Sequence, residues 1–173
     1  MLEFYRFYKE DCKRSGGKIT LWQKKFIFYF RASQQCKNKF LRALFRFRWK
    51  IIKEKHGIEM SYNTNIGHGF FLVHPFNITI NPNAVIGNNC NIHKGVVIGE
   101  ENRGKRKGAP IIGNNVWIGV NAVIVGRIII GNDVLIAPNT YINCDIPSHS
   151  VVFGNPCIIK HKDNATEKYI NNI

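Results

Sequence analysis

Apolar residues recur along this chain with two different periods, and the change of period divides it near residue 56. Between residues 21 and 56 they fall three or four positions apart, which places them on one face of a helix that we expect to be interrupted near Ser33. Residues 2–14 predict another short helix, ended by the SGG of residues 15–17. Basic residues occupy much of the remaining helix surface: Lys24, Lys25, Arg31, Lys39, Arg42, Arg46, Arg48, Lys50 and Lys53.

Beyond residue 64 the period becomes six, which fits neither a regular helix nor a regular strand. It is typical of a parallel β-helix whose hexapeptide units each supply a short strand and a turn. Three units make one triangular coil of eighteen residues, and the isoleucines that keep the period point inward and stack. These isoleucines are Ile80, Ile86, Ile92, Ile98, Ile112, Ile118, Ile124, Ile130, Ile136 and Ile142. A corner with positive φ is expected at the glycine or asparagine that follows them, and the glycines are Gly87, Gly99, Gly113, Gly119 and Gly131.

The six-residue rhythm is broken twice. Between residues 72 and 80, two extra residues displace the coil just after His74. Between Ile98 and Ile112 the step is fourteen instead of twelve. The segment 99–111, GEENRGKRKGAPI, is polar, glycine-rich and basic, so we expect it to leave the coil as a loop, where binding function usually lies.

From about residue 56 to residue 161 the repeats, with the stretch GHGFFLVH (67–74) and the ending VVFGNPC (151–157), resemble the left-handed parallel β-helix acyltransferases. Within them the chain looks most similar to the serine-acetyltransferase-like branch, closest to sugar and polysaccharide O-acetyltransferases. The left-handedness of the β-helix is implied by this resemblance and not by the six-residue period. The expected fold is mainly β: a basic amphipathic helical segment (1–56), a hexapeptide-repeat β-helix acyltransferase domain (57–161) with excursion loop 99–111, and a C-terminal tail (162–173).

The resemblance makes His74 the general base, because the family's catalytic histidine closes the matching stretch. A neutral imidazole can take the proton of an alcohol as its oxygen attacks an acetyl thioester. The family carboxylate that orients this histidine corresponds to Glu59, fifteen residues earlier, where the family more often has aspartate. The residues alone also allow His74 to be a bulge residue and Glu59 a solvated acid. We expect His93 to point outward at a corner, and we place the remaining histidines at the surface: His56, His68, His149 and His161.

Acetyl-CoA is the co-substrate that the resemblance implies, held in a groove between subunits of a homotrimer. The positions that map to its contacts are Trp117, Gly119, Val120, Ala137, Pro138, Asn143 and Lys160. A second set, in the basic loop, is expected to contact the acceptor or a phosphate: Arg103, Lys105, Arg106 and Lys107. Trp117 fits interface packing at least as well as ligand contact. No His or Cys cluster has metal-ligand spacing, so no metal is expected, and the five cysteines are scattered singly.

The acceptor that we expect is a hydroxyl of a sugar, free or lipid-linked, in surface polysaccharide (capsule or O-antigen) biosynthesis. The resemblance carries this choice, because Val73, Gly108 and Ala109 stand where serine-specific members have charged groups. The alternative is serine or another small alcohol. A non-catalytic β-helix is disfavoured by His74 and the excursion loop, and nucleic-acid binding is disfavoured by the lack of a recognised motif.

The net charge of +14 is concentrated in residues 1–56, which hold 16 Lys and Arg against 4 Asp and Glu. A helix with an aromatic and a cationic face suits an anionic membrane surface, although its apolar face also suits packing on the β-helix or in the trimer. The longest apolar runs are too short to span a bilayer, and the start of the sequence lacks a secretory leader. We therefore expect a cytoplasmic protein, peripheral at the inner face of the membrane if the basic segment binds there.

Overall fold

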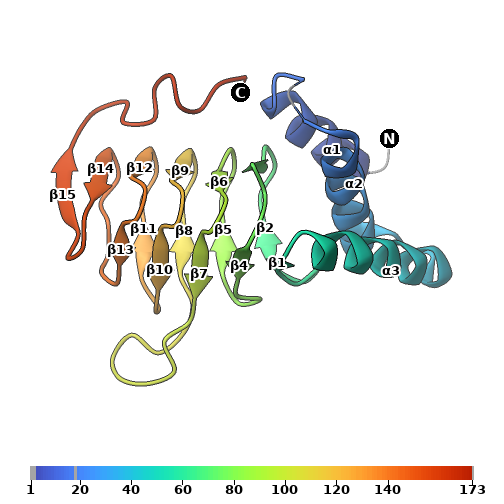
Figure 1. Cartoon of the computed structure of the whole chain (residues 1–173), viewed down its shortest axis with the longest axis horizontal. Coiled ribbons are helices and arrows are strands. Elements are labelled where there is room, and N and C mark those ends of the chain that lie inside the picture. The colour runs from blue at the N-terminus through green and yellow to red at the C-terminus, as the bar shows by residue number, and fades with distance from the viewer. Residues whose placement is uncertain (1–2, 18, 173) are drawn as a thin grey trace.

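Three helices precede a parallel β-helix in the computed structural model, which describes residues 3–17 and 19–172 (Figure 1). The helices are α1 (Glu3–Arg14), α2 (Leu21–Gln35) and α3 (Lys39–Lys55). The helical region is interrupted at residues 36–38, not near Ser33 as predicted. Ser33 lies inside α2, where its hydroxyl donates to the Phe30 carbonyl. Asn38 caps α3 through its side-chain oxygen. Residues 1, 2, 18 and 173, which fall within the predicted segments, lie outside the described residues.

The strands form three sheets along the coil. Sheet A comprises β1 (Ile58–Glu59), β4 (Ile78–Ile80), β7 (Val97–Gly99), β10 (Val123–Val125) and β13 (Tyr141–Ile142). Sheet B comprises β11 (Ile129–Ile130), β8 (Ile111–Ile112), β5 (Val85–Ile86) and β2 (Asn65–Ile66). Sheet C comprises β15 (Ile158–His161), β14 (Ser150–Phe153), β12 (Val134–Ile136), β9 (Val116–Ile118), β6 (Asn91–His93) and β3 (Phe71–Val73). Neighbouring strands run parallel except β14 and β15, which are antiparallel.

The pairing register confirms the expected coil length and corrects the size of the loop. Ile111 pairs with Ile129, eighteen positions on, as three hexapeptides require. Val85 pairs with Ile111, twenty-six positions on, so the coil that carries the loop is longer by eight residues, not by the two that the isoleucine spacing indicated. Figure 1 shows this segment leaving the coil between β7 and β8, as expected. The strand after the loop, β8, is therefore the next strand of the same coil, and the loop does not contain an additional hexapeptide unit.

The periodic isoleucines line the interior of the coil, where each is 2% exposed or less. The expected role of the glycines that follow them is wrong. None of these five glycines has a positive φ; the positive values belong to asparagines of the turns, such as Asn89 and Asn115. Glycine is required for a different reason, since a Cβ added at Gly87 would lie 2.5 Å from the Gly113 carbonyl oxygen of the next coil. Close stacking of the coils selects glycine here.

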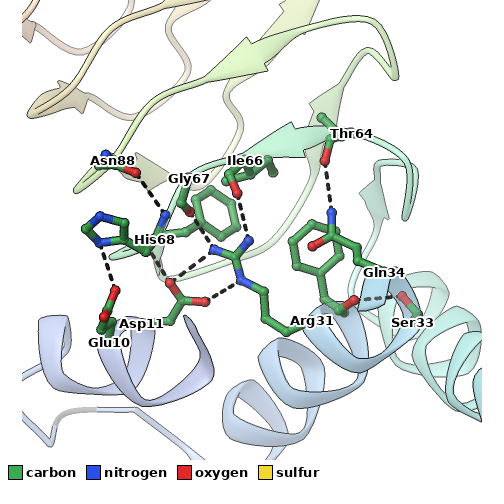
Figure 2. A network of polar contacts seen from close by, with 12 residues as sticks. Glu10, Asp11, Arg31, Ser33, Gln34, Thr64, Ile66, Gly67, His68 and Asn88 are labelled. Carbon is green, nitrogen blue, oxygen red and sulfur yellow. Dashed lines mark hydrogen bonds and ion pairs between the residues drawn. The ribbon is translucent and has the colours of Figure 1, made fainter. Parts of the chain in front are cut away.

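A buried ion pair joins the helices to the first coil of the β-helix (Figure 2). Arg31 of α2 donates to both carboxylate oxygens of Asp11 of α1, at 2.8 and 3.1 Å, and both side chains are fully buried. The same guanidinium donates to the carbonyls of Ile66 and Gly67, and Asp11 accepts from the Phe70 amide. Arg31 was expected on the cationic face of its helix. It instead saturates backbone groups at the end of the coil that would otherwise be buried unpaired.

The C-terminal residues 162–172 run back along the outer side of sheet C toward α1 (Figure 1). Asp133 anchors this tail by accepting bonds from the amides of Ala165 and Thr166, both at 2.9 Å, and from the Thr166 hydroxyl at 2.7 Å. Farther along, the Tyr169 ring packs edge-on against Trp117, with ring centroids 5.3 Å apart. The tail therefore covers part of sheet C.

Removing the Asp133 carboxylate is expected to release the tail. In Asp133→Ala, the amides of Ala165 and Thr166 lose their acceptor, so their hydrogen exchange should accelerate by at least about ten-fold, as loss of roughly 1.4 kcal/mol of protection would give. Asp163→Ala is the matched control, because its pair with His161 has side chains 71% and 83% exposed. Hydrogen exchange is measured by mass spectrometry. Equal exchange rates in wild type and Asp133→Ala would show that the Asp133 carboxylate does not protect the tail.

The anchor should also weaken in acid. Burial alone would raise the pKa of Asp133, but hydrogen bonds from Thr166, His149 and Ala165 together hold that pKa below its usual value. A carboxyl whose pKa is lower in the folded state stabilises it above the pKa of the unfolded chain, about 3.9 for aspartate. That contribution is lost as the pH falls from there through the folded pKa, so tail protection should decline below about pH 4.

Candidate active site

His74 lies in the turn between β3 and β4, where the predicted irregularity of the coil is confirmed. Val73 pairs with His93, twenty positions on, whereas Thr79 pairs with Val97, eighteen positions on. The turn after β3 is thus two residues longer than the corresponding turn of the next coil, which follows β6. His74 has a φ of 49°, in the left-handed region, which residues other than glycine adopt uncommonly, although asparagine, aspartate and histidine do so more often than most.

A hollow of about 620 Å³ opens beside His74. One wall is the stretch from Phe71 to Phe76, and the other is the start of α2 with Thr20, Trp22 and Gln23. The Gln23 side chain donates to the Leu72 carbonyl at 3.3 Å and ties the two walls together. The helical segment is therefore part of the surroundings of His74, which the sequence did not indicate.

The wall from α2 carries an aromatic cluster that corrects the placement of His56. This imidazole was expected at the surface, but it stacks flat on Trp22 with ring centroids 3.6 Å apart. Phe76 packs edge-on against the same imidazole at 5.0 Å. Burial, and to a lesser extent the charge of Lys55, lower the pKa of His56. It is a neutral packing group at physiological pH.

His93 is a second imidazole close to His74. Burial, and then the neighbouring His74, lower the pKa of His93 to about 4, so it is neutral at physiological pH. Its Nε2 is buried and has no hydrogen-bond partner among the described residues. Its ring packs on Trp117 with centroids 4.5 Å apart. The sequence predicted only that His93 points outward at a corner, not that a neutral imidazole lies next to the candidate base.

Glu59 lies on the same coil as His74 but faces another neighbour. Its carboxylate accepts from the Thr79 hydroxyl at 3.3 Å, in a hollow of sheet A. Among the residues that the structure describes, no hydrogen bond or ion pair joins it to His74. The fifteen-residue spacing suggested nearly one coil, but this coil has twenty residues, so Glu59 lines up with Thr79, five positions past His74. The pairing of Glu59 with His74 stays a prediction.

Four of the residues predicted to hold the donor lie together in two stacked turns. Gly119 and Val120 follow β9, Ala137 and Pro138 follow β12, and these strands are neighbours in sheet C. The Gly119 amide donates to the Ile136 carbonyl at 2.8 Å. A Cβ added at Gly119 would lie 2.6 Å from the Pro138 nitrogen, so only glycine allows the turns to approach this closely.

The turn of His74 belongs to the same corner of the triangular coil. We call the four successive turns at this corner, residues 74–77, 94–96, 119–122 and 137–140, the corner column. Backbone hydrogen bonds join them, from Gly95 to Phe76 at 3.0 Å, from Asn121 to Lys94 at 3.1 Å and from Asn139 to Val120 at 2.9 Å. Neighbouring strands lie about 4.8 Å apart, so the first and last turns are roughly 14 Å apart along one edge. The candidate base and these four donor positions thus share an edge.

The remaining predicted donor positions lie elsewhere. Trp117 is on the outer side of sheet C, under Tyr169 of the tail, in keeping with packing. Asn143 follows β13 at the next corner, beside Cys144, whose sulfur is 3.8 Å from that of Cys157. This cysteine pair was not predicted, because its members lie thirteen positions apart in the sequence. Lys160 is exposed on β15, with its ammonium 5.8 Å from the Phe153 ring centroid.

The basic residues of the excursion loop are exposed, as the composition of the loop indicates. Arg106 pairs with Glu101 at 3.1 Å, while Arg103, Lys105 and Lys107 are exposed. The Arg106 carbonyl accepts from the Arg127 amide, which fixes the base of the loop to the coil. Within residues 3–17 and 19–172, no helix is long and apolar enough to cross a bilayer, and no group of three or more His, Cys, Asp or Glu is arranged to bind a metal.

Known proteins share the repeats and the fold of this chain. Residues 109–144 match the family described as bacterial transferase hexapeptide (six repeats). A serine acetyltransferase of Synechococcus elongatus is 33% identical over 87% of this chain and 62% of its own length. One from Helicobacter pylori is 34% identical over 62% of this chain and 63% of its own length. The solved structure of the Neisseria gonorrhoeae serine acetyltransferase has a TM-score of 0.77 at 25% identity, over 92% of this chain and 67% of that one.

The chain is similar to hexapeptide-repeat transferases and matches their family description over residues 109–144. Its resemblance to the left-handed β-helix acyltransferases, and the fold class expected from it, are confirmed, since the soybean serine acetyltransferase shares the fold with a TM-score of 0.77. The expected closeness to sugar O-acetyltransferases finds no support, because the relatives described above are serine acetyltransferases. This hexapeptide-repeat chain spans only about three fifths of the length of those two relatives.

Proposed function

We propose that the protein transfers an acetyl group from acetyl-CoA to the hydroxyl of a small acceptor of the L-serine type, with His74 as general base. The observation that carries this proposal is the corner column, which sets His74 and the turns of Gly119 and Pro138 along one edge. An extended thioester donor laid along that edge would present its carbonyl near His74. The predicted homotrimer would close the other side of this groove with a second copy.

In the proposed reaction, the His74 imidazole takes the proton of the acceptor hydroxyl as its oxygen bonds to the thioester carbonyl carbon. Collapse of the tetrahedral intermediate breaks the carbon–sulfur bond, and the imidazolium returns the proton to the departing thiolate. His93 supports this role, because a neutral ring beside His74 adds no charge that would oppose formation of the imidazolium.

The family relatives favour a small hydroxy amino acid over the sugar that the sequence analysis preferred. A glycan hydroxyl is retained as the second candidate because Val73, Gly108 and Ala109 lack the charges expected for a zwitterion. Gly108 lies against the aliphatic part of the Arg127 side chain at the base of the loop. Under this proposal Arg127, and not residue 108 itself, is the cation that meets the carboxylate of serine.

Release of free thiol from acetyl-CoA, measured with L-serine and with a panel of sugars and lipid-linked sugars, tests the proposal. We expect kcat/KM for L-serine to exceed that for every sugar by at least about ten-fold, the effect of one well-placed charge contact of roughly 1.4 kcal/mol. O-Methyl serine, which lacks the free hydroxyl, is the control and should release no thiol above background. Efficient turnover of a sugar with little turnover of L-serine would instead assign the acceptor to the glycan class.

A further inference from the structure

Helix α3 has two apolar faces, and only one of them is covered. Trp49 is 2% exposed and packs on Phe26 and Phe30 of α2. On the opposite side, five apolar side chains are exposed: Phe40 76%, Leu41 47%, Leu44 47%, Phe47 60% and Ile51 49%. Residues 40, 44, 47 and 51 follow helical spacing and form one continuous row about 170° around the helix from Trp49, and Leu41 lies about 90° from the centre of that row. We call these five residues the α3 stripe.

Cations border the α3 stripe on both sides. At 100° per residue, Arg48 and Lys55 fall on one side of the row 40–44–47–51, between it and Leu41. Lys50 and Lys39 fall on the other side, beyond Glu54, which pairs with Lys50 at 3.8 Å. The helix holds seven Lys and Arg in seventeen residues and a single acid, Glu54. An apolar stripe between two rows of cations is the arrangement of helices that lie in the plane of a membrane interface.

A hollow beside the stripe gathers more positive charge. It measures about 420 Å³ and lies between α3 and residues 60–62, with Arg46, Lys50 and Lys53 in its lining. Phe47 of the α3 stripe also lines it, so apolar and cationic contacts meet at one place. No carboxylate is among its lining residues. A phosphate group at the level of lipid headgroups suits such a hollow better than a neutral or cationic ligand.

We propose that the α3 stripe docks this protein on the surface of a bilayer that contains anionic lipid. Charge decides between this occupant and a second copy of the chain, because two α3 helices face to face would bring their cations together. An anionic surface instead neutralises both flanks while the stripe enters the apolar layer. Figure 1 shows α3 at the end of the molecule away from β15 and the excursion loop, so docking there leaves the loop clear of the surface.

Flotation of the purified full chain with vesicles tests this proposal, without acetyl-CoA or an acceptor. The vesicles are phosphatidylcholine alone or phosphatidylcholine mixed with phosphatidylglycerol. We expect binding to the mixed vesicles that weakens in high salt, and at least about ten-fold weaker binding to phosphatidylcholine alone. Phe40→Ser with Phe47→Ser should reduce binding to mixed vesicles by a further factor of about ten, because the apolar anchor is lost.

Leu21→Ser is the matched control. Leu21 is 69% exposed and apolar but begins α2 and lies outside the α3 stripe, so its loss should leave binding unchanged. Circular dichroism and light scattering on each variant show whether fold and assembly are intact. Equal binding of wild type and Phe40→Ser/Phe47→Ser, or no binding of wild type to mixed vesicles, would overturn the proposal. A smaller assembly in the double variant would assign the stripe to contacts between copies and overturn it as well.

Discussion

His74→Ala should lose turnover by roughly 100- to 10,000-fold, the contribution usual for a positioned general base. Without the imidazole, no group takes the proton of the acceptor hydroxyl as its oxygen attacks. Affinity for acetyl-CoA should change little, because Gly119 and Pro138 lie about 10 and about 14 Å away along the corner column. The measurement is thiol release under saturating donor, with donor affinity determined by calorimetry on the same preparation.

Two further variants show whether the loss of turnover is specific to His74. His68→Ala is the matched control, since this histidine lies in the same stretch, is 40% exposed and pairs with Glu10 at 2.9 Å. It should keep nearly full turnover. His93→Ala separates the two neighbouring imidazoles and should cost much less than His74→Ala if His93 only packs and positions. Turnover that survives in His74→Ala but fails in His93→Ala would transfer the role of base to His93.

Glu59→Gln tests the predicted pairing of Glu59 with His74, which no hydrogen bond or ion pair among the described residues supports. If the carboxylate orients His74 and stabilises its cation, the variant should slow turnover, but by less than His74→Ala. The bond from Thr79 survives in the variant, because the glutamine oxygen still accepts it. Unchanged turnover in Glu59→Gln would make Glu59 a residue of sheet A alone and leave His74 without an acidic partner.

The repeat pattern predicted the fold because each isoleucine reports directly on one buried position of the coil. The same period also located the turn of His74 and the excursion loop, since any extra residue shifts the phase of everything after it. It did not predict loop length correctly. A jump from Ile98 to Ile112 is compatible with several ways of assigning units, and only the pairing of Val85 with Ile111 decides among them.

The parts of the site that were missed depend on contacts between distant segments. Whether Trp22 of α2 stacks on His56 and forms a wall beside His74 depends on how a helix docks on the coil, which periodicity does not encode. The proximity of Cys144 and Cys157 likewise follows from a turn that folds back, not from spacing. Arg31 was assigned to solvent because an arginine in an amphipathic helix is usually exposed, and burial required Asp11 on another helix to pair with it.

Arg31→Ala should lower the free energy of unfolding by roughly 3–5 kcal/mol, because it leaves the Asp11 carboxylate buried without its counter-ion. The Ile66 and Gly67 carbonyls would also lose their donor. Stabilities of natural domains are about 5–15 kcal/mol, so this is a large share of the total. Denaturant unfolding at one fixed protein concentration measures the loss without confounding it with changes in assembly.

The exposed pair Lys50–Glu54 supplies the matched control, with side chains 65% and 59% exposed and 3.8 Å between the charged atoms. Glu54→Ala should change stability by no more than about 0.5 kcal/mol. If Arg31→Ala fell within that same range, the pair would not be sealed from water. If the expected loss is found, turnover should fall too, because Arg31 fixes α2, and the start of α2 forms the wall opposite His74. The ion pair then links the stability of the helical segment to the shape of the candidate active site.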